Sequence, residues 1–233
     1  MASLFLIRHG QASFGSANYD QLSPLGQQQA DETGLFLKRA GVVVHQAFAG
    51  TLSRQQETAT RVMAHQESAA LVQTDARFNE IDNEGQLEEL IPLLTETHPN
   101  LRAWLDSGES KSYQKVIEAV FNMWVSPECP PLTTQSWCEY RQAAMAALKA
   151  VMSSAPPGSN SAVFTSGGTI ATLVSAVLGV SDDRVYQFYE PVFNCSITRF
   201  IFSQRGVALS SFNDIGHLQY RSADLDGELV SYR

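Results

Sequence analysis

The sequence predicts a three-layer α/β/α sandwich with a mostly parallel central sheet and an inserted helical cap. Apolar runs typical of buried strands alternate with amphipathic segments over residues 1–84 and again over 137–233, and this alternation is typical of helices packed on both faces of a sheet. Residues 85–136 show helical spacing with no strand between the helices. We therefore predict a single domain, residues 1–233, with a helical cap at about 85–136.

The opening strand and the first helix have clear local signals. The uninterrupted apolar run Leu4–Ile7 is typical of a strand buried on both faces, and it ends in an Arg-His-Gly turn. The polar residues 11–22 predict a loop over the end of this strand. Ser23 can cap a helix whose first residue is Pro24, and Gly41 can close it in a left-handed conformation.

Two further strands and a helix complete the first half of the core. Short strands are predicted at 46–50 and 71–75. The helix between them begins near Thr51 or Ser53. Residues 77–85 are polar and irregular, which predicts a loop before the cap.

The second half of the core begins with a strand at 161–167, followed by an amphipathic helix that ends at Gly179. Residues 196–214 predict two strands joined by a turn at 204–206, hence a hairpin. The polar residues from 216 onward predict a tail extended over the surface.

Composition excludes several classes of protein. A net charge of −8 argues against nucleic-acid binding, which needs clustered Lys and Arg. The three cysteines are widely spaced and the five histidines are scattered, so neither a disulfide framework nor a metal site is predicted. No signal peptide or membrane span is visible, and we expect a cytoplasmic protein. The oligomeric state does not follow from the sequence.

Chemically active residues fall at the ends of the predicted strands. They are Arg8-His9-Gly10, Arg54, Glu80 and Ser166-Gly167-Gly168-Thr169. Two arginines and a helix N-terminus around one histidine predict an anion site, for which phosphate is the natural ligand. A histidine among cations stays neutral, so a ring nitrogen can attack phosphorus, while a nearby carboxyl group can protonate the departing oxygen.

These residues resemble the histidine phosphatase superfamily, also called phosphoglycerate mutase-like. Five motifs carry the resemblance, namely LIRHGQ at the start, DQLSPLGQQQA, AGTLSRQQETA around Arg54, FNE at Glu80 and TSGGTIA at Ser166. The resemblance covers residues 3–82 and 161–217 but not the cap.

The resemblance implies a role for each matching residue. His9 would be the nucleophile that forms a phosphohistidine intermediate. Arg8 and Arg54 would hold the phosphoryl oxygens and neutralise charge during transfer. Glu80 would be the acid, although two more acidic residues follow it closely. No cofactor or metal would be needed, and the partner would be a small phosphorylated substrate rather than nucleic acid or membrane.

One residue departs from the family pattern. Members typically carry a second histidine where this chain has Ser166. A serine hydroxyl can still bind a phosphate oxygen, but losing a charge-assisted donor costs on the order of 1.5–3 kcal/mol. Backbone N–H groups of Gly167 and Gly168 could share this binding, and His217 is another candidate for the missing donor.

The expected function is hydrolysis of a small phosphomonoester, at a rate that Ser166 could reduce. Two alternatives stay open. Ser166 also fits a weakened protein that only binds a phosphorylated ligand. A phosphoglycerate mutase is less favoured, because the stretch IDNEGQ after Glu80 is acidic and has no Arg or Lys to hold a substrate carboxylate. The acidic cap suggests a substrate with little negative charge beyond its phosphate.

Overall fold

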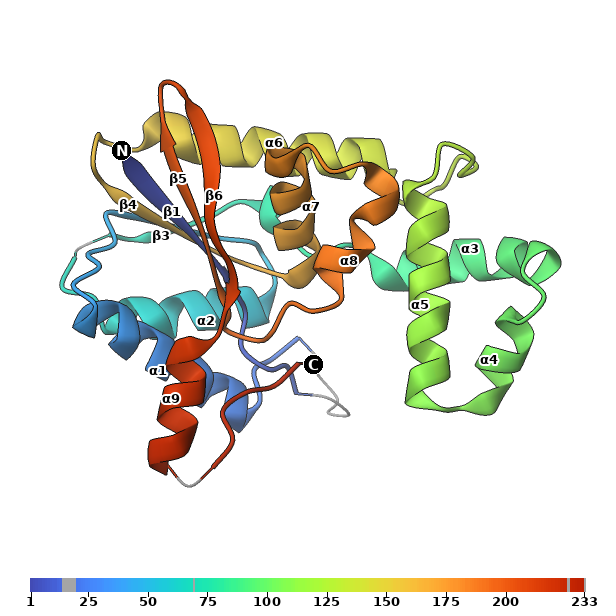
Figure 1. Cartoon of the computed structure of the whole chain (residues 1–233), viewed down its shortest axis with the longest axis horizontal. Coiled ribbons are helices and arrows are strands. Elements are labelled where there is room, and N and C mark those ends of the chain that lie inside the picture. Colours follow the sequence, from blue (N-terminus) through green and yellow to red (C-terminus); the bar gives the residue numbers. More distant parts are fainter. Residues whose placement is uncertain (14–19, 69, 226, 233) are drawn as a thin grey trace.

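The computed structural model describes residues 1–13, 20–68, 70–225 and 227–232. Within these residues the fold is built on a six-stranded sheet with the order β3-β2-β4-β1-β5-β6 (Figure 1). The strands are β1 (Ala2–Arg8), β2 (Gln46–Ala49), β3 (Val72–Thr74), β4 (Asn160–Thr165), β5 (Ile197–Ser203) and β6 (Gly206–Asp214).

The sheet is mixed. Strands β1, β4, β2 and β3 pair in parallel, whereas β5 is antiparallel to both β1 and β6. The register places Arg8 opposite Thr165, so the end of β1 lies beside the end of β4. Residues that follow these two parallel strands therefore meet at one edge of the sheet, which is where open α/β sheets bind ligands.

The side chains of β1 enter two hydrophobic cores. Leu4 and Leu6 point to one face, which is covered by α6 (Trp137–Ser154) and α7 (Gly167–Leu178). Phe5 and Ile7 point to the other, where α1 (Pro24–Arg39) and α2 (Ser53–Ala64) pack and α9 (Gly216–Leu225) lies against α1. In Figure 1 the sheet lies between α6 above and α1 and α2 below. The predicted three-layer α/β/α fold class is thus confirmed, with a mixed sheet.

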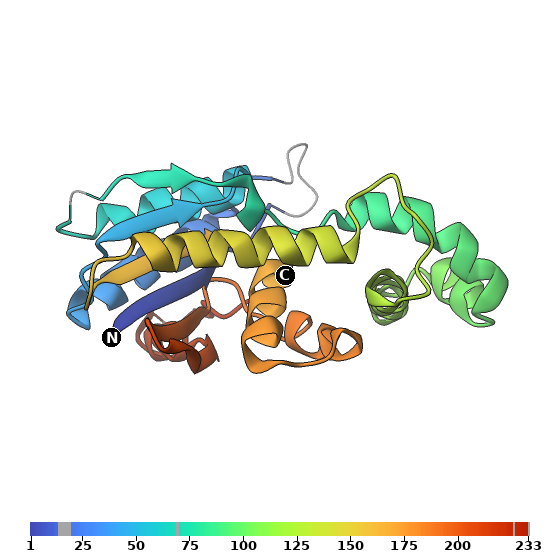
Figure 2. The ribbon, with the colours of Figure 1, turned by 90° about the horizontal axis from the view of Figure 1, so that it is seen from above.

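A third apolar cluster lies beyond the end of the sheet. It is formed by α3 (Asn83–Thr97), α4 (Leu101–Ser107) and α5 (Ser110–Val125), which pack on one another and on α8 (Tyr186–Tyr189). Figures 1 and 2 both show the first three helices set apart from the sheet. The division into a core and a cap at 85–136 stays a prediction.

Several local predictions are confirmed in detail. Ser23 caps α1 by accepting a hydrogen bond from the N–H of Gly26, Pro24 is the first helical residue, and Gly41 has a φ of 68°. The hairpin of β5 and β6 turns at Gln204-Arg205. Of the loop predicted at 11–22, residues 14–19 lie outside the described part of the chain.

Two predictions are wrong in part. The tail after residue 216 is not extended throughout, because Gly216–Leu225 form α9 and bury Leu218 against α1. The loop predicted at 77–85 ends earlier, because Asp82 caps α3 through the N–H of Gly85. In the described residues, none of the helices has the length and apolar character that a membrane crossing requires.

Candidate active site

His9 lies at the end of β1 with its ring orientation fixed by the backbone. The ring is buried, and Nδ1 lies 2.8 Å from the carbonyl oxygen of Gly10. A carbonyl can only accept, so Nδ1 carries the proton and Nε2 keeps its lone pair. Burial first, and then the charges of Arg54 and Arg8, hold the pKa of His9 well below its ordinary value. The ring is therefore neutral at neutral pH, which is the form that the predicted nucleophilic role requires.

The glycine of the Arg-His-Gly turn is required by close backbone approach. A Cβ on Gly10 would lie 2.3 Å from the carbonyl oxygen of Gly26, and a Cβ on Gly26 would lie 2.1 Å from that of Gln11. The first turn of α1 thus packs directly on the turn that carries His9. The N–H of Gly10 also donates to Thr58 Oγ1 over 3.0 Å, which ties the turn to α2.

Arg54 projects from the first turn of α2 toward His9. Its Nε lies 3.1 Å from His9 Nε2 and can donate to the lone pair there. Its Nη1 lies 2.6 Å from Oδ1 of Asp20. The position of Arg54 also depends on how α2 packs against α1.

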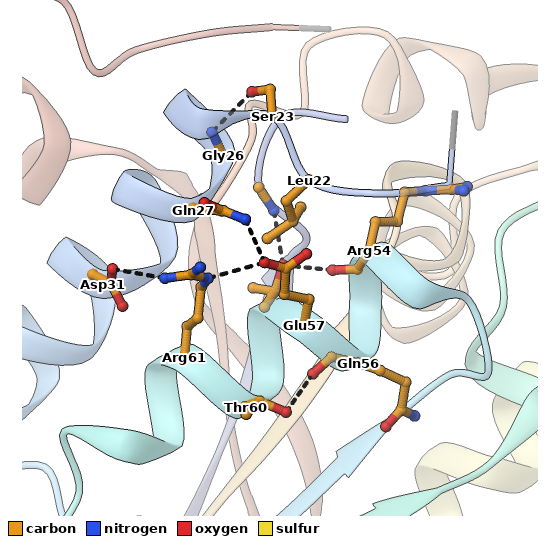
Figure 3. Close-up of polar contacts among 12 residues, drawn as sticks. Leu22, Ser23, Gly26, Gln27, Asp31, Arg54, Gln56, Glu57, Thr60 and Arg61 are labelled. Atoms are coloured by element: carbon orange, nitrogen blue, oxygen red, sulfur yellow. Dashed lines mark hydrogen bonds and ion pairs between the residues drawn. The ribbon is translucent and has the colours of Figure 1, made fainter. Parts of the chain in front are cut away.

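Polar contacts seat α2 against α1 (Figure 3). Glu57 Oε1 accepts from Gln27 Nε2 at 2.8 Å and from Arg61 Nε at 3.1 Å, and Arg61 Nη1 donates to Asp31 at 3.1 Å. In Figure 3 the Arg54 side chain extends away from this cluster. Such half-exposed contacts contribute little stability individually. They join α1 to α2 at a place that the Arg54 side chain does not reach.

Arg8 is oriented by carbonyl oxygens from distant parts of the chain. Its Nη1 donates to the carbonyl of Val192 and, over 3.1 Å, to that of Tyr232. Gln29 holds the segment that contains Tyr232, because its Nε2 donates to Ser231 Oγ over 2.8 Å while its Oε1 accepts from the N–H of Gln11 over 2.9 Å. Gln29, the last glutamine of the GQQQA motif, therefore joins the segment after β1 to the C-terminal segment.

Glu80 faces the same arginines. Its Oε1 accepts from the N–H groups of Ile81 and Gly168, both over 3.0 Å. Burial raises the pKa of Glu80, although these hydrogen bonds and the charges of Arg8 and Arg54 oppose the rise. A carboxyl group with a raised pKa stays protonated to higher pH and can act as an acid.

The glycines at the start of α7 make room for these side chains. A Cβ on Gly168 would lie 2.3 Å from Glu80 Oε1, so any side chain there would displace the carboxyl group. Gly167 lies between Tyr189 and Arg8, since its Cβ would be 3.3 Å from Tyr189 Cε2 and 3.7 Å from Arg8 Nε. The helix N-terminus therefore reaches the arginine and the carboxyl group together.

Ser166 is fully buried and bound to a residue that sequence reasoning overlooked. Gln55 Nε2 donates to Ser166 Oγ over 2.8 Å and to the carbonyl of Phe78 over 3.0 Å. A hydroxyl that accepts from Gln55 still has its own O–H to donate. Binding of phosphate by Ser166 and Gly167 stays a prediction.

The structure brings the predicted catalytic residues into one electrostatic neighbourhood. The charges of Arg8 and Arg54 act on both His9 and Glu80. Asp20, Gln55 and Tyr232 were given no role by the sequence. Asp20 at least opens the DQLSPLGQQQA motif, whereas nothing near Tyr232 in the sequence indicates a contact with Arg8.

His217 is not part of this site. Its ring is buried against α1, with Nε2 3.0 Å from Thr33 Oγ1 and the ring stacked on Phe36. Burial lowers the pKa of His217 from 6.5 to about 4, against the opposing charges of Asp214 and Glu32. His217 is thus a packing residue, and it does not supply the donor that Ser166 lacks.

This buried histidine predicts a loss of stability in mild acid. With a pKa of 6.5 unfolded and about 4 folded, the unfolded chain binds more protons between these values. The contribution of His217 to the free energy of unfolding is thus complete above pH 6.5 and falls as the pH drops toward 4, by at most about 3 kcal/mol. In urea unfolding between pH 7 and pH 4, the free energy of unfolding should decline less in His217→Gln than in wild type. The glutamine can still donate to Thr33. Equal declines would contradict this prediction.

Within the described ranges, no group of three or more His, Cys, Asp or Glu side chains could hold a metal ion. The positive charge described at the site comes from Arg8 and Arg54, beside the N–H groups at the start of α7.

Comparison with known proteins identifies the family to which the chain belongs. Residues 4–215 match the family described as Histidine phosphatase superfamily (branch 1). No curated protein matches the chain. Among solved structures, phosphoserine phosphatase from Entamoeba histolytica in complex with 3-phosphoglyceric acid has a TM-score of 0.64 at 23% identity, covering 94% of this chain and 100% of that one. A phosphoglycerate mutase from Bacillus anthracis str. Sterne has a TM-score of 0.66 at 18% identity, covering 93% and 94%. A putative α-ribazole-5′-P phosphatase from Escherichia coli K-12 has a TM-score of 0.63 at 19% identity, covering 92% and 98%. At identities below 25%, these TM-scores show a shared fold.

Proposed function

The chain belongs to the histidine phosphatase superfamily, and we propose that it is a phosphatase that hydrolyses a small phosphomonoester through a phosphohistidine on His9. One observation carries the proposal. The unprotonated Nε2 of His9 accepts a hydrogen bond from Arg54 Nε over 3.1 Å, so a cationic donor lies beside the atom that would attack phosphorus.

In the first step, His9 Nε2 attacks phosphorus and the bond from phosphorus to the ester oxygen breaks. Glu80 gives its proton to the departing oxygen, so the alcohol leaves neutral and Glu80 becomes a carboxylate. Arg8 and Arg54 bind the equatorial oxygens, which carry most of the negative charge during transfer. The anchoring of Arg8 by two carbonyl oxygens supports this role, because a fixed donor needs no reorganisation during the reaction.

In the second step, water attacks the phosphohistidine. The Glu80 carboxylate takes the proton from this water, phosphate is released and His9 Nε2 recovers its lone pair. The same carboxyl group serves both steps, and its raised pKa supports the first of them. No metal or cofactor has a part in this scheme.

The binding alternative rests on Ser166, whose hydroxyl already accepts from Gln55. The mutase alternative is weakened by the segment after Glu80, where Asp82 caps α3 and the stretch IDNEGQ contains no Arg or Lys. A site of this kind is poorly suited to a substrate with its own carboxylate.

The test is turnover of p-nitrophenyl phosphate and of a panel of phosphorylated metabolites, with EDTA present throughout. We expect hydrolysis, and after quenching in alkaline detergent we expect a phosphoprotein that is stable in alkali and labile in acid, with the phosphate mapped to His9. Tight binding of phosphorylated metabolites without turnover would favour the binding alternative. Phosphoryl transfer between substrate hydroxyls in preference to water would favour the mutase.

Ser166→Ala tests the smaller part of the proposal. If the Ser166 hydroxyl donates to a phosphate oxygen, its loss removes one neutral hydrogen bond, which contributes roughly 0.5–1.5 kcal/mol. We expect KM for p-nitrophenyl phosphate to rise by about 3- to 10-fold, with a modest fall in the melting temperature because Gln55 loses one acceptor. A matched control is Ser154→Ala, since this serine lies at the far end of α6. An unchanged KM in Ser166→Ala would show that Ser166 only packs against Gln55.

A further inference from the structure

The carboxylate of Asp20 lies on the guanidinium group that contacts the nucleophile. Asp20 Oδ1 is 2.6 Å from Arg54 Nη1, and Oδ2 accepts from the N–H of Ser53 over 2.7 Å. The same guanidinium directs its Nε at His9 Nε2 over 3.1 Å. One negatively charged side chain and the candidate nucleophile therefore share a single arginine.

The donors that hold Asp20 are those that an external anion would use. They are a guanidinium group and the first N–H of a helix, since Ser53 begins α2 and the N-cap residue Leu52 makes no side-chain capping bond. The Asp20 carboxylate thus takes both donors that the first turn of α2 directs toward an anion.

The two side chains differ in accessibility. The Arg54 side chain is 11% exposed, whereas that of Asp20 is 33% exposed. Arg54 lies on α2, which is packed against α1, whereas Asp20 lies in the segment before α1. The Asp20 carboxylate is therefore the partner that can turn toward water. A phosphoryl group bound to His9 Nε2 would bring its oxygens to the same guanidinium, and two anions at one arginine repel each other.

We propose that Asp20 competes with the phosphoryl group for Arg54 and thereby limits how tightly the site binds phosphate. This inference rests on the proposed function, because it requires Arg54 to be a phosphate ligand. Its consequence is a site in which the charge of one substrate phosphate is sufficient to displace Asp20, while the phosphate product is bound weakly enough to leave. Asp20 opens the DQLSPLGQQQA motif, whose first residue thereby acquires a role.

The experiment measures binding of inorganic phosphate by calorimetry at pH 7 to the wild-type protein and to Asp20→Asn. We expect Asp20→Asn to bind phosphate about tenfold more tightly, which corresponds to about 1.4 kcal/mol. Asp20→Ala should also bind phosphate more tightly than wild type. Agreement between the two variants would show that the loss of the charge, and not the new amide, is responsible. In turnover, inhibition by the phosphate product should become stronger in the same proportion.

The control for net charge is Asp31→Asn. It also removes one carboxylate from an Asp–Arg pair between α1 and α2, but its partner is Arg61, which lies in the Glu57 cluster (Figure 3). We expect its phosphate affinity to be unchanged. Thermal unfolding of each variant checks that the fold is retained.

Arg54→Gln distinguishes the two ways in which the inference could fail. If Arg54→Gln weakens phosphate binding but Asp20→Asn and Asp20→Ala bind phosphate no more tightly than wild type, Asp20 only orients Arg54 and the inference is overturned. If wild type and all variants bind no phosphate, the proposed function fails, and the inference fails with it.

Discussion

Replacement of His9 by alanine is expected to reduce turnover of p-nitrophenyl phosphate by roughly 10⁴- to 10⁶-fold, as the loss of a covalent nucleophile does in other enzymes. Without Nε2 no phosphohistidine can form, and Arg54 would have no acceptor at that point. Acid-labile phosphate on the protein should disappear as well. The measurement is initial rate at saturating substrate, together with rapid-quench phosphoprotein analysis.

His45→Ala is the matched control, because this histidine is exposed and lies at the opposite end of β2 from the site. It should retain full turnover. The described hydrogen bonds of the His9 ring join it to the carbonyl oxygen of the adjacent Gly10 and to Arg54 Nε, and Arg54 keeps its ion pair with Asp20 when the ring is removed. His9→Ala should therefore remain folded by circular dichroism. Turnover in a folded His9→Ala protein at the wild-type rate would overturn the covalent mechanism.

Glu80→Gln is expected to slow hydrolysis of an alkyl phosphate such as β-glycerophosphate by roughly 10²- to 10⁴-fold, the usual range for loss of a general acid. The glutamine oxygen can still accept from Ile81 and Gly168, so the site should keep its shape. Nitrophenolate leaves readily without a proton. Formation of the phosphohistidine from p-nitrophenyl phosphate should therefore be much less affected, and a burst of nitrophenolate should precede a slow steady state.

The pH profile supplies a second measure of Glu80. Its acid role requires the protonated form, so activity should fall as the pH rises through the pKa of Glu80, which burial raises. His9 must be neutral, and because its pKa is lowered, activity should persist well into mild acid. In Glu80→Gln the decline at higher pH should vanish while the acid decline remains. An unchanged profile, or an equal loss in the rate of phosphohistidine formation from both substrates, would assign the acid to another residue.

The parts of the fold that the sequence predicts correctly depend on local signals. Ser23, Pro24 and Gly41 each satisfy a backbone requirement of α1 that involves residues within a few positions. The apolar run of β1 is also a local signal, because every side chain of a strand that is covered on both faces can be apolar. Helix α9 was missed because its outer face is polar and its few buried residues only become evident against α1.

The sequence indicated which residues at the ends of strands come together, but not the contacts that orient them. His9, Arg54 and Glu80 were identified by residue type at the ends of strands. The contacts that position them join residues far apart in sequence, such as Gln55 with Ser166 and Arg8 with Tyr232. Amide and carbonyl groups of this kind are common throughout the chain, so no pattern singles out the pair that will meet.

The bond from Arg8 to the carbonyl of Tyr232 also has a consequence for the order in which the molecule assembles. Strand β1 is made first during synthesis, yet its neighbours in the sheet are β4 and β5, which begin at Asn160 and Ile197. Such distant pairing slows folding, because the ends of long loops must be brought together before any contact forms. Arg8 and His9 are therefore synthesised long before Val192 and Tyr232, whose carbonyl oxygens orient the Arg8 guanidinium group.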